Sequence, residues 1–235
     1  MEFLNAFYLA LDMLFSGDAL VAEIIILSLE VSIFASVAAL ILGLPLGAYL
    51  ATSHFWGRGA SITIVNTFLS MPPVVIGLLV YLLISRAGPL GFLELLYSPA
   101  AMMIAQFILV LPISAALSRQ IFEVLHYEYG PLFDTLGTPT LKRISVLIYD
   151  SRLSLMTVGL ACFGRAISEV GAVIIVGGNI AHLTRVMTTT IALETSRGEL
   201  ARALALGIVL MLIALLVNSL SSLLKGYMQR AGMHV

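Results

Sequence analysis

The charged residues of this sequence that could do chemistry are few, and two of them stand inside a long apolar run. Arg165 and Glu169 lie four residues apart in the mostly apolar stretch 153–176. Charged groups at membrane depth are costly, and they usually face a water-filled cavity or one another. The i, i+4 spacing allows the two side chains to pair on a helix. Two interpretations stay open: a structural ion pair between helices, or a cationic group on a transport pathway.

A second group of polar side chains follows in the segment 177–199. It supplies hydroxyls, one amide and one guanidinium, and such donors suit the oxygens of a tetrahedral oxyanion. The group comprises Asn179, Thr184, Arg185, Thr188, Thr189 and Thr190. The stretch 186–193 is apolar enough to re-enter a bilayer. We therefore expect either a re-entrant segment on the pathway or an ordinary loop between two helices.

Two consecutive prolines, Pro72 and Pro73, interrupt the apolar run 62–85. They remove two backbone donors from a helix and must break or kink it. Carbonyls freed in this way at membrane depth are tolerated where they line a cavity or find protein partners. The pair therefore predicts either a bend that lines a pathway or a kink that serves packing.

The longest polar connection, about 119–152, contains a short apolar segment. Pro131 suits the first turn of a helix and Gly137 suits its C-terminal cap, which predicts a short helix over 131–136. An apolar face in a polar connection predicts docking into the groove of a partner, or packing on the membrane surface. The residues expected to make these contacts are Pro131, Leu132, Phe133, Asp134, Leu136 and Gly137.

These residues need elements that cross a bilayer. The chain is 60% hydrophobic and 11% charged, whereas soluble domains are about 45–50% apolar and about 25% charged. A spanning helix needs about 20 apolar residues, and five runs satisfy this condition, at about 19–51, 62–85, 99–117, 153–176 and 200–224. Their continuity argues against strands. We predict an all-α polytopic membrane protein, with a transmembrane domain over 18–226 and a short tail over 227–235.

The first 17 residues form a separate unit in this prediction. Apolar side chains of residues 3–16 fall on one helical face and polar ones fall opposite, and the segment is too short to span a bilayer. The pattern predicts an amphipathic helix that lies in the membrane interface. A helix buried against the bundle would show the same pattern.

Lysine and arginine in the short connections predict the orientation. One side of a five-span chain holds Arg58, Arg119, Lys142, Arg143, Arg152, Lys225 and Arg230. The other side holds Arg86, Arg185, Arg197 and Arg202. The richer side is predicted to be cytoplasmic, which places the N-terminus outside and the C-terminus inside.

Several classes of activity lack their sequence signals. The chain has no Gly-x-x-x-x-Gly-Lys-Ser/Thr phosphate-binding loop, so it cannot hydrolyse ATP by that machinery. Its four histidines are scattered and Cys162 is its only cysteine, so neither a zinc site nor a catalytic triad is indicated. The net charge of −1 gives no sign of a nucleic-acid partner. We expect a non-enzyme that binds no cofactor itself.

Several blocks of the sequence resemble the permease subunits of type I ABC importers, within the molybdate and tungstate family. Residues 71–77 read Met-Pro-Pro-Val-Val-Ile-Gly, similar to the L-P-P-V-V-x-G stretch of molybdate-type permeases. Residues 164–172, 178–180 and 184–185 resemble their R-x-x-G-E-x-G-A, N-I and T-R blocks, with Ser168 in place of a glycine. The Ile-Ser-Glu-Val-Gly-Ala-Val variant is most similar to the tungstate branch. Gly137 matches the glycine of the E-A-A-x-x-x-G coupling loop, whose E-A-A part is replaced here.

The resemblance implies a homodimer in the cytoplasmic (inner) membrane of a bacterium or archaeon. Two ATPase subunits, which hold ATP and Mg, would dock on the coupling residues 131–137, and a periplasmic or lipid-anchored oxyanion-binding protein would dock outside. The resemblance implies import of tungstate, or of molybdate, by alternating access. The expected pathway or gate residues are Pro72, Pro73, Arg165, Glu169, Asn179, Thr184, Arg185 and Thr188. An ABC permease for another small solute and an ion-gradient-driven secondary transporter remain alternatives.

Overall fold

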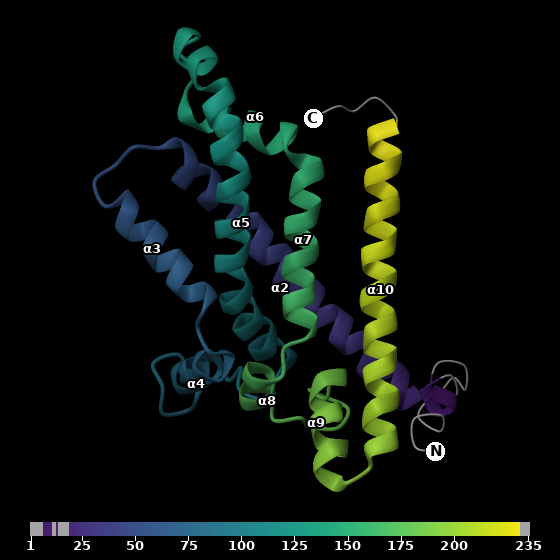
Figure 1. The fold of residues 1–235 in the computed structure, drawn as a ribbon. Coiled ribbons are helices and arrows are strands. Elements are labelled where there is room, and N and C mark those ends of the chain that lie inside the picture. The colour runs from purple at the N-terminus through teal and green to yellow at the C-terminus, as the bar shows by residue number, and fades with distance from the viewer. Residues whose placement is uncertain (1–6, 11–12, 14–18, 231–235) are drawn as a thin grey trace.

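The computed structural model describes residues 7–10, 13 and 19–230, and every regular element within them is a helix. Figure 1 shows long upright helices with short ones gathered at their two ends: α4, α8 and α9 lie at the lower end and α6 at the upper end. The predicted all-α membrane fold is confirmed. We call the upper end, where α5 and α6 meet in a hairpin, the hairpin end. We call the lower end, where α4, α8 and α9 follow breaks between helices, the break end.

Three helices are long and apolar enough to cross a membrane on their own. They are α2 (Ala19–Thr52), α5 (Pro99–Thr135) and α10 (Leu200–Arg230). Two further pairs qualify together although each is sharply bent: α3 (Arg58–Leu69) with α4 (Pro73–Ile84) at 101°, and α6 (Thr140–Asp150) with α7 (Arg152–Ile167) at 80°. The described residues therefore contain three spans, or five if each bent pair counts as one, and the second count agrees with the prediction.

Helices α2 and α5 make the closest contact in the molecule, and they do so through small residues. A side chain on Gly47 would collide with α5, because its Cβ would lie 2.7 Å from the carbonyl oxygen of Ala115 and closer still to the Ser118 hydroxyl. Gly43 meets Ser114 in the same way. Small residues allow helix backbones to approach within a membrane, where lipid gives no hydrophobic drive for association. The hydroxyl of Ser118 donates back to Ser114 O on its own helix, so its donor is satisfied inside the contact.

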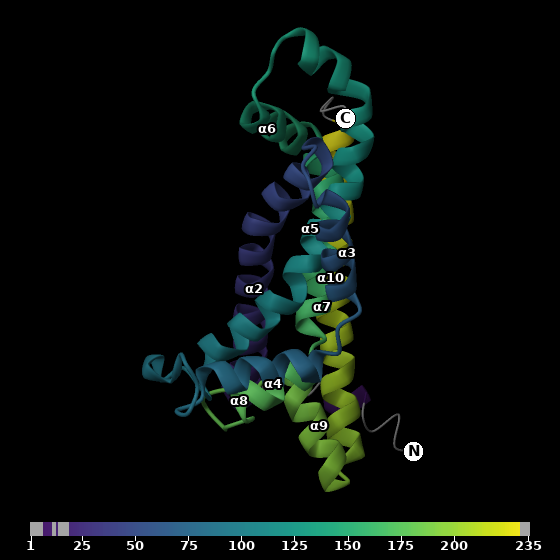
Figure 2. The same ribbon diagram turned by 90° about the vertical axis from the view of Figure 1, so that its left-hand side faces the viewer.

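The two prolines break their helix, as the sequence predicts. Helix α3 ends at Leu69 and α4 begins at Pro73, with Pro72 in extended conformation between them. Figure 2 shows α4 lying across the foot of the long helices, alongside α8 (Gly171–Gly177). The two short helices touch backbone to backbone, since a Cβ on Gly77 would lie 2.7 Å from Ala172 Cα. The prediction of one continuous span over 153–176 is wrong: α7 ends at Ile167, and α8 is a separate short helix.

The predicted separate helix over 131–136 is also wrong. Helix α5 continues from Pro99 to Thr135, and Pro131 lies inside it. Proline costs a helix one hydrogen bond and some strain, and burial of Phe133 in the cluster that contains Phe122 and Leu147 offsets that cost. Gly137 ends the helix in the left-handed region, with φ of 59°. Its capping role is therefore as predicted.

Most of the predicted amphipathic segment 3–16 lies outside the described residues. Residues 7–10 are helical, with Ala10 buried beside Ile24 and Met187, and with Phe7 and Tyr8 exposed. This turn packs on the bundle through Leu9 and Ala10, while its aromatic side chains are exposed.

The α2–α5 contact generates a prediction about stability. Substitution Gly47→Ala forces a methyl group into the seam and is expected to lower the free energy of unfolding by about 1–3 kcal/mol, the usual cost of overpacking. The matched control is Gly207→Ala on α10, where an added Cβ would meet nothing within 4 Å and the melting temperature should hold or rise. Thermal unfolding in detergent measures both variants. Equal melting temperatures for the two would contradict the tight seam.

Candidate functional site

Arg165 and Glu169 meet at the gap between α7 and α8. Arg165 lies in the last turn of α7, and Glu169 follows the end of that helix instead of continuing it, which corrects the expectation that both stand within one span. The guanidinium Nη1 of Arg165 donates to Glu169 Oε2, so the pair that the spacing predicts is present. Glu169 is buried, with 4% of its side chain exposed, whereas Arg165 is one-third exposed.

Glu169 also fixes the start of α8 and its contact with α9 (Met187–Arg197). Its Oε1 accepts a hydrogen bond from Ala172 N at 3.1 Å, and a carboxylate in this position satisfies a free amide of the first helical turn. Thr188 Oγ1 donates to the backbone carbonyl of Glu169 at 2.8 Å. One residue thus joins the end of α7, the start of α8 and the start of α9.

Gln106 on α5 belongs to this site, although the sequence reasoning missed it. Its Nε2 donates to Ala166 O at 3.0 Å, on the last turn of α7. Its Oε1 is buried and has no hydrogen-bond partner within the described residues. A lone amide in the otherwise apolar run 99–117 was the signal that could have identified it. Gln106 connects α5 directly to the residues beside Glu169.

The polar residues of the segment 177–190 form a loop between α8 and α9 whose side chains hydrogen-bond to one another and to its own backbone. Thr184 Oγ1 donates to Gly177 O and accepts from Ile180 N. Thr189 Oγ1 donates to Asn179 Oδ1 at 2.9 Å. The Nη2 of Arg185 donates to Asn179 O at 3.4 Å, while its Nε is buried with no partner in the described chain. The loop is therefore held by its own side chains.

Two adjacent threonines, Thr188 and Thr189, connect the Arg165–Glu169 pair to the loop between α8 and α9. Thr188 bonds to Glu169 and Thr189 bonds to Asn179, so the start of α9 contacts both polar groups. Val186, which precedes α9, is its N-cap, and the stretch considered for re-entry belongs largely to this helix at the break end (Figure 1).

Helix α2 supports the same loop from its other side. Ser28 Oγ accepts a hydrogen bond from Met187 N at 2.8 Å. Glu23 Oε2 lies 2.9 Å from His182 Nδ1. Both contacts join residues 159 positions apart in the sequence, which is why sequence reasoning did not pair them.

The proline bend lies next to Glu169. A Cβ on Gly171 would stand 2.8 Å from Val74 Cγ2 and 3.6 Å from Glu169 Oε1, so the first turns of α4 and α8 nearly touch. The structure thus brings the bend at Pro72 and Pro73 beside Glu169, and Thr188 ties that residue to α9. Asn179, Thr184 and Arg185 lie on the loop that precedes α9, and Thr189 on α9 contacts that loop through Asn179.

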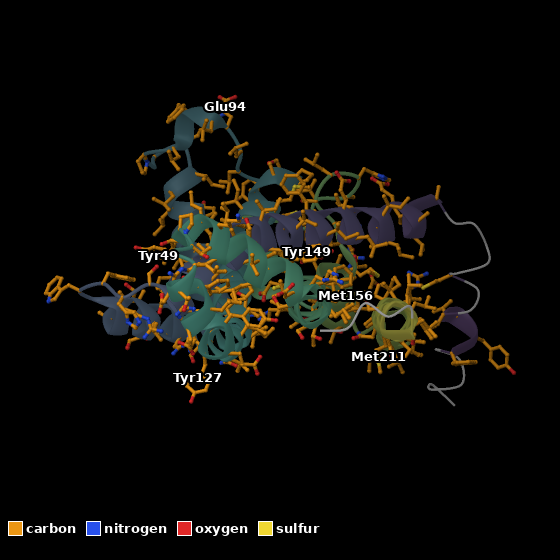
Figure 3. All side chains as sticks on the ribbon, turned by 90° about the horizontal axis from the view of Figure 1, so that it is seen from above. Tyr49, Glu94, Tyr127, Tyr149, Met156 and Met211 are labelled. Atoms are coloured by element: carbon orange, nitrogen blue, oxygen red, sulfur yellow. The ribbon has the colours of Figure 1, made fainter. Side chains whose placement is uncertain are left out.

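The opposite end of the molecule is formed by the α5–α6 hairpin, residues 126–150. Leu132, Leu136 and Leu141 expose 57%, 69% and 81% of their surface around its turn. Asp134, Pro131 and Gly137 are exposed as well, but Phe133 is 5% exposed and packs against the Tyr129 ring. Of the six residues predicted to make docking contacts, Phe133 is buried within the hairpin, and the other five are exposed. Figure 3, viewed from this end, shows Tyr127 pointing away from the helices.

Arg143 holds the hairpin turn, and the sequence reasoning assigned it no such role. Its Nη1 pairs with Asp134 Oδ1 at 2.9 Å, and its Nε donates to Thr138 O at 2.7 Å. Its guanidinium also lies over the Phe133 ring, 5.6 Å from the centroid. The exposed leucines are therefore presented on a rigid turn.

Comparison with known proteins gives consistent matches along most of the chain. Residues 43–230 match the family described as binding-protein-dependent transport system inner membrane component. The chain is 40% identical to the tungstate uptake system permease protein TupB of Peptoclostridium acidaminophilum, over 93% of this chain and 96% of that protein. It is 43% identical to TupB of Campylobacter jejuni, over 69% and 68% of the two chains. It is 36% identical to a probable anion ABC transporter permease protein of Haloferax volcanii, over 83% and 86%.

The Arg165–Glu169 pair generates a prediction that a double-mutant cycle can measure. Substitutions Arg165→Met and Glu169→Gln keep side-chain volume, and the glutamine can still accept from Ala172 N. We expect a coupling energy of about 1–3 kcal/mol, within the range for residues in one hydrogen-bond network. The control cycle uses Glu194 and Arg197, whose arginine is 57% exposed and whose coupling should be about 0.2–1 kcal/mol. Unfolding in detergent measures both; a larger coupling in the control would contradict the structural role of Glu169.

Proposed function

The chain belongs to the family of binding-protein-dependent transport system inner membrane components, and on this basis we propose that it carries a tetrahedral oxyanion, tungstate first and molybdate second. It is a multi-pass membrane protein and the permease subunit of an ABC importer. The observation that carries the choice of substrate is the 40% identity, over nearly the full length of both chains, to a protein named as a tungstate uptake permease.

The polar groups at the break end suit passage of such an anion. Arg165 is one-third exposed and uses one nitrogen on Glu169, which leaves guanidinium donors for oxyanion oxygens. The loop 177–190 adds hydroxyls, although most of them are occupied by internal hydrogen bonds. Donors that are already hydrogen-bonded hold the loop in one conformation. We therefore assign Arg165 to contact with the anion. We assign a structural role in the gate to Pro72, Pro73, Glu169, Asn179, Thr184, Arg185 and Thr188.

The α5–α6 hairpin suits an ATPase partner. Its exposed leucines, on a turn fixed by Arg143, would enter a groove on the ATPase, with Pro131, Asp134 and Gly137 at the rim. In this proposal ATP and Mg are bound by the ATPase, and the chain itself catalyses nothing. Two copies of the chain would pair with two ATPase subunits, and a periplasmic or lipid-anchored binding protein would dock at the break end. The hairpin end would be cytoplasmic, which places the N-terminus outside and the C-terminus inside.

Helix α5 supplies the mechanical link in this proposal. It has 37 residues and is therefore about 55 Å long at 1.5 Å per residue. One end forms the hairpin turn, and Gln106 near the other end holds the last turn of α7. When ATP binding draws the two ATPases together, a displacement of the hairpins would be transmitted along α5 to the α7–α8 gap. That is a route to alternating access by movement of rigid elements.

Transport in proteoliposomes tests the proposed function. The chain is reconstituted with its ATPase and binding protein, and uptake of tungstate is measured with molybdate, sulfate and phosphate as competitors. We expect uptake that requires ATP, with molybdate as the strongest competitor. Uptake that proceeds without the ATPase and follows an ion gradient would indicate a secondary transporter instead. ATP-dependent uptake of a different solute alone would refute the choice of substrate.

The hairpin generates a separate prediction about assembly. A Leu136→Asp substitution places a charge on the proposed contact face and should lower the amount of ATPase that co-purifies by about tenfold or more, as for residues central to an interface. The control is Leu200→Asp, because Leu200 is 52% exposed and is the first residue of α10, which begins just after α9, a helix at the break end. That variant should retain its ATPase. Normal co-purification with Leu136→Asp would show that the ATPase docks elsewhere.

A further inference from the structure

Helix α3 carries a row of polar side chains that the site described above does not include. Thr63 stands three and four residues before Asn66 and Thr67, and Ser70 stands four and three residues after them, so the four side chains lie on one face of the helix and its C-cap. All four are exposed. We call this set the α3 polar stripe. The sequence places it immediately before the Pro72–Pro73 bend.

The stripe faces away from α5, the long helix that α3 packs against most extensively among the described residues. Ile64, Val65 and Phe68 line an apolar cavity together with Leu46 of α2 and with Ile108, Leu111, Pro112 and Ala115, all four of which belong to α5. At about 100° per residue, these three positions lie opposite the centre of the stripe. Its polar side chains therefore point out of the described part of the chain.

The groups of the stripe are available to a ligand. Thr63 Oγ1 donates to Gly59 O at 3.0 Å, and Thr67 Oγ1 donates to Thr63 O at 2.8 Å, so both hydroxyls are held by bonds that a rotation can release. The side chains of Asn66 and Ser70 make no hydrogen bond to the described residues. The hydroxyls of Thr63 and Thr67 are thus bonded within the helix, whereas the side chains of Asn66 and Ser70 are free of such bonds.

Lipid is not a suitable environment for this surface. Helix α3 and helix α4 together have the length and composition of one broken span, and Figures 1 and 2 show α3 running between the hairpin end and α4. Polar side chains at membrane depth face a protein partner or a water-filled cavity. The Asn66 amide has no partner within the described chain and lipid would leave its donors unsatisfied, so we infer that the stripe faces water or a second copy.

The far end of the stripe lies near the functional site. Ser70 is two residues from Pro72, and Val74 beyond the bend contacts Gly171 beside Glu169. The stripe therefore leads from the hairpin side towards the buried Glu169 and its partner Arg165. A series of neutral donors suits conduction, because an ion must bind well enough to enter but weakly enough to leave.

We propose that Thr63, Asn66, Thr67 and Ser70 line a water-filled lane that binds the tetrahedral oxyanion weakly on its way from the α7–α8 gap to the hairpin end. The assignment rests on the proposed function, because it takes the ligand from it. Hydroxyl and amide N–H groups donate to the oxyanion oxygens, and no charged group holds the ion along this length.

Cysteine accessibility tests the environment of the stripe in the assembled complex. Native Cys162 is buried and is replaced by alanine. Single cysteines at residues 63, 66, 67 and 70 should react with a membrane-impermeant anionic thiol reagent, and tungstate should slow that reaction. The control is Val65→Cys, on the side that faces α5, which should react at least tenfold more slowly. Stripe cysteines that do not react with the reagent would overturn the lane. Stripe cysteines that form a disulfide between two copies of the chain, and do not react with the reagent, would overturn it as well.

Transport by conservative variants tests its function. Asn66→Leu and Thr67→Val remove donors at nearly constant volume, and each should lower ATP-dependent tungstate uptake by about tenfold, as when a hydrogen bond to a charged group is lost. Ser61→Ala is the control, because Ser61 lies outside the stripe on the same helix and donates to Gly57 O. Normal uptake by both stripe variants overturns the lane alone. A wild-type complex that takes up no oxyanion overturns the proposed function and the lane with it.

Discussion

The close approach of α2 and α5 is the contact on which the rest of the structure depends. Gly43 and Gly47 allow the two backbones to meet at Ser114, Ala115 and Ser118, and the two helices then serve as the frame for every shorter element. Ser28 on α2 accepts the first amide of α9, and Gln106 on α5 holds the last turn of α7. A change in the seam would therefore alter the loop 177–190 and the α7–α8 gap together.

Helix breaks near the site are stabilised by side chains from elsewhere in the chain. Backbone groups freed at membrane depth must find partners within the protein. Glu169 takes the Ala172 amide and pairs with Arg165, Thr188 takes the Glu169 carbonyl, and Gln106 takes the Ala166 carbonyl. A break that is supported from two other helices, α5 and α9, can act as a joint, since its hydrogen bonds define one arrangement without a continuous helix across it.

The sequence correctly predicted the features that depend on neighbouring residues in the chain. It did not predict the features that depend on contacts between residues far apart in the chain. The apolar runs predicted the long helices, and the two prolines predicted the α3–α4 break, because both effects act within a few residues. The end of α7 at Ile167 depends on Gln106, and the continuity of α5 through Pro131 depends on burial of Phe133. The clamp role of Arg143 and the partners of Ser28 and His182 needed the fold, as did the sidedness of the α3 polar stripe. No spacing rule connects residues that are 159 positions apart.

The distribution of charge at the two ends of α3 bears on how such a pathway could work. A strongly bound anion would be trapped, and an apolar channel would exclude it, so a pathway needs donors of intermediate strength. The cation beside the bend, Arg165, is paired with the buried carboxylate of Glu169, which weakens its hold on an anion. Neutral side chains then continue the surface along α3. In the proposed pathway, an arrangement of this kind would favour passage of the anion over storage.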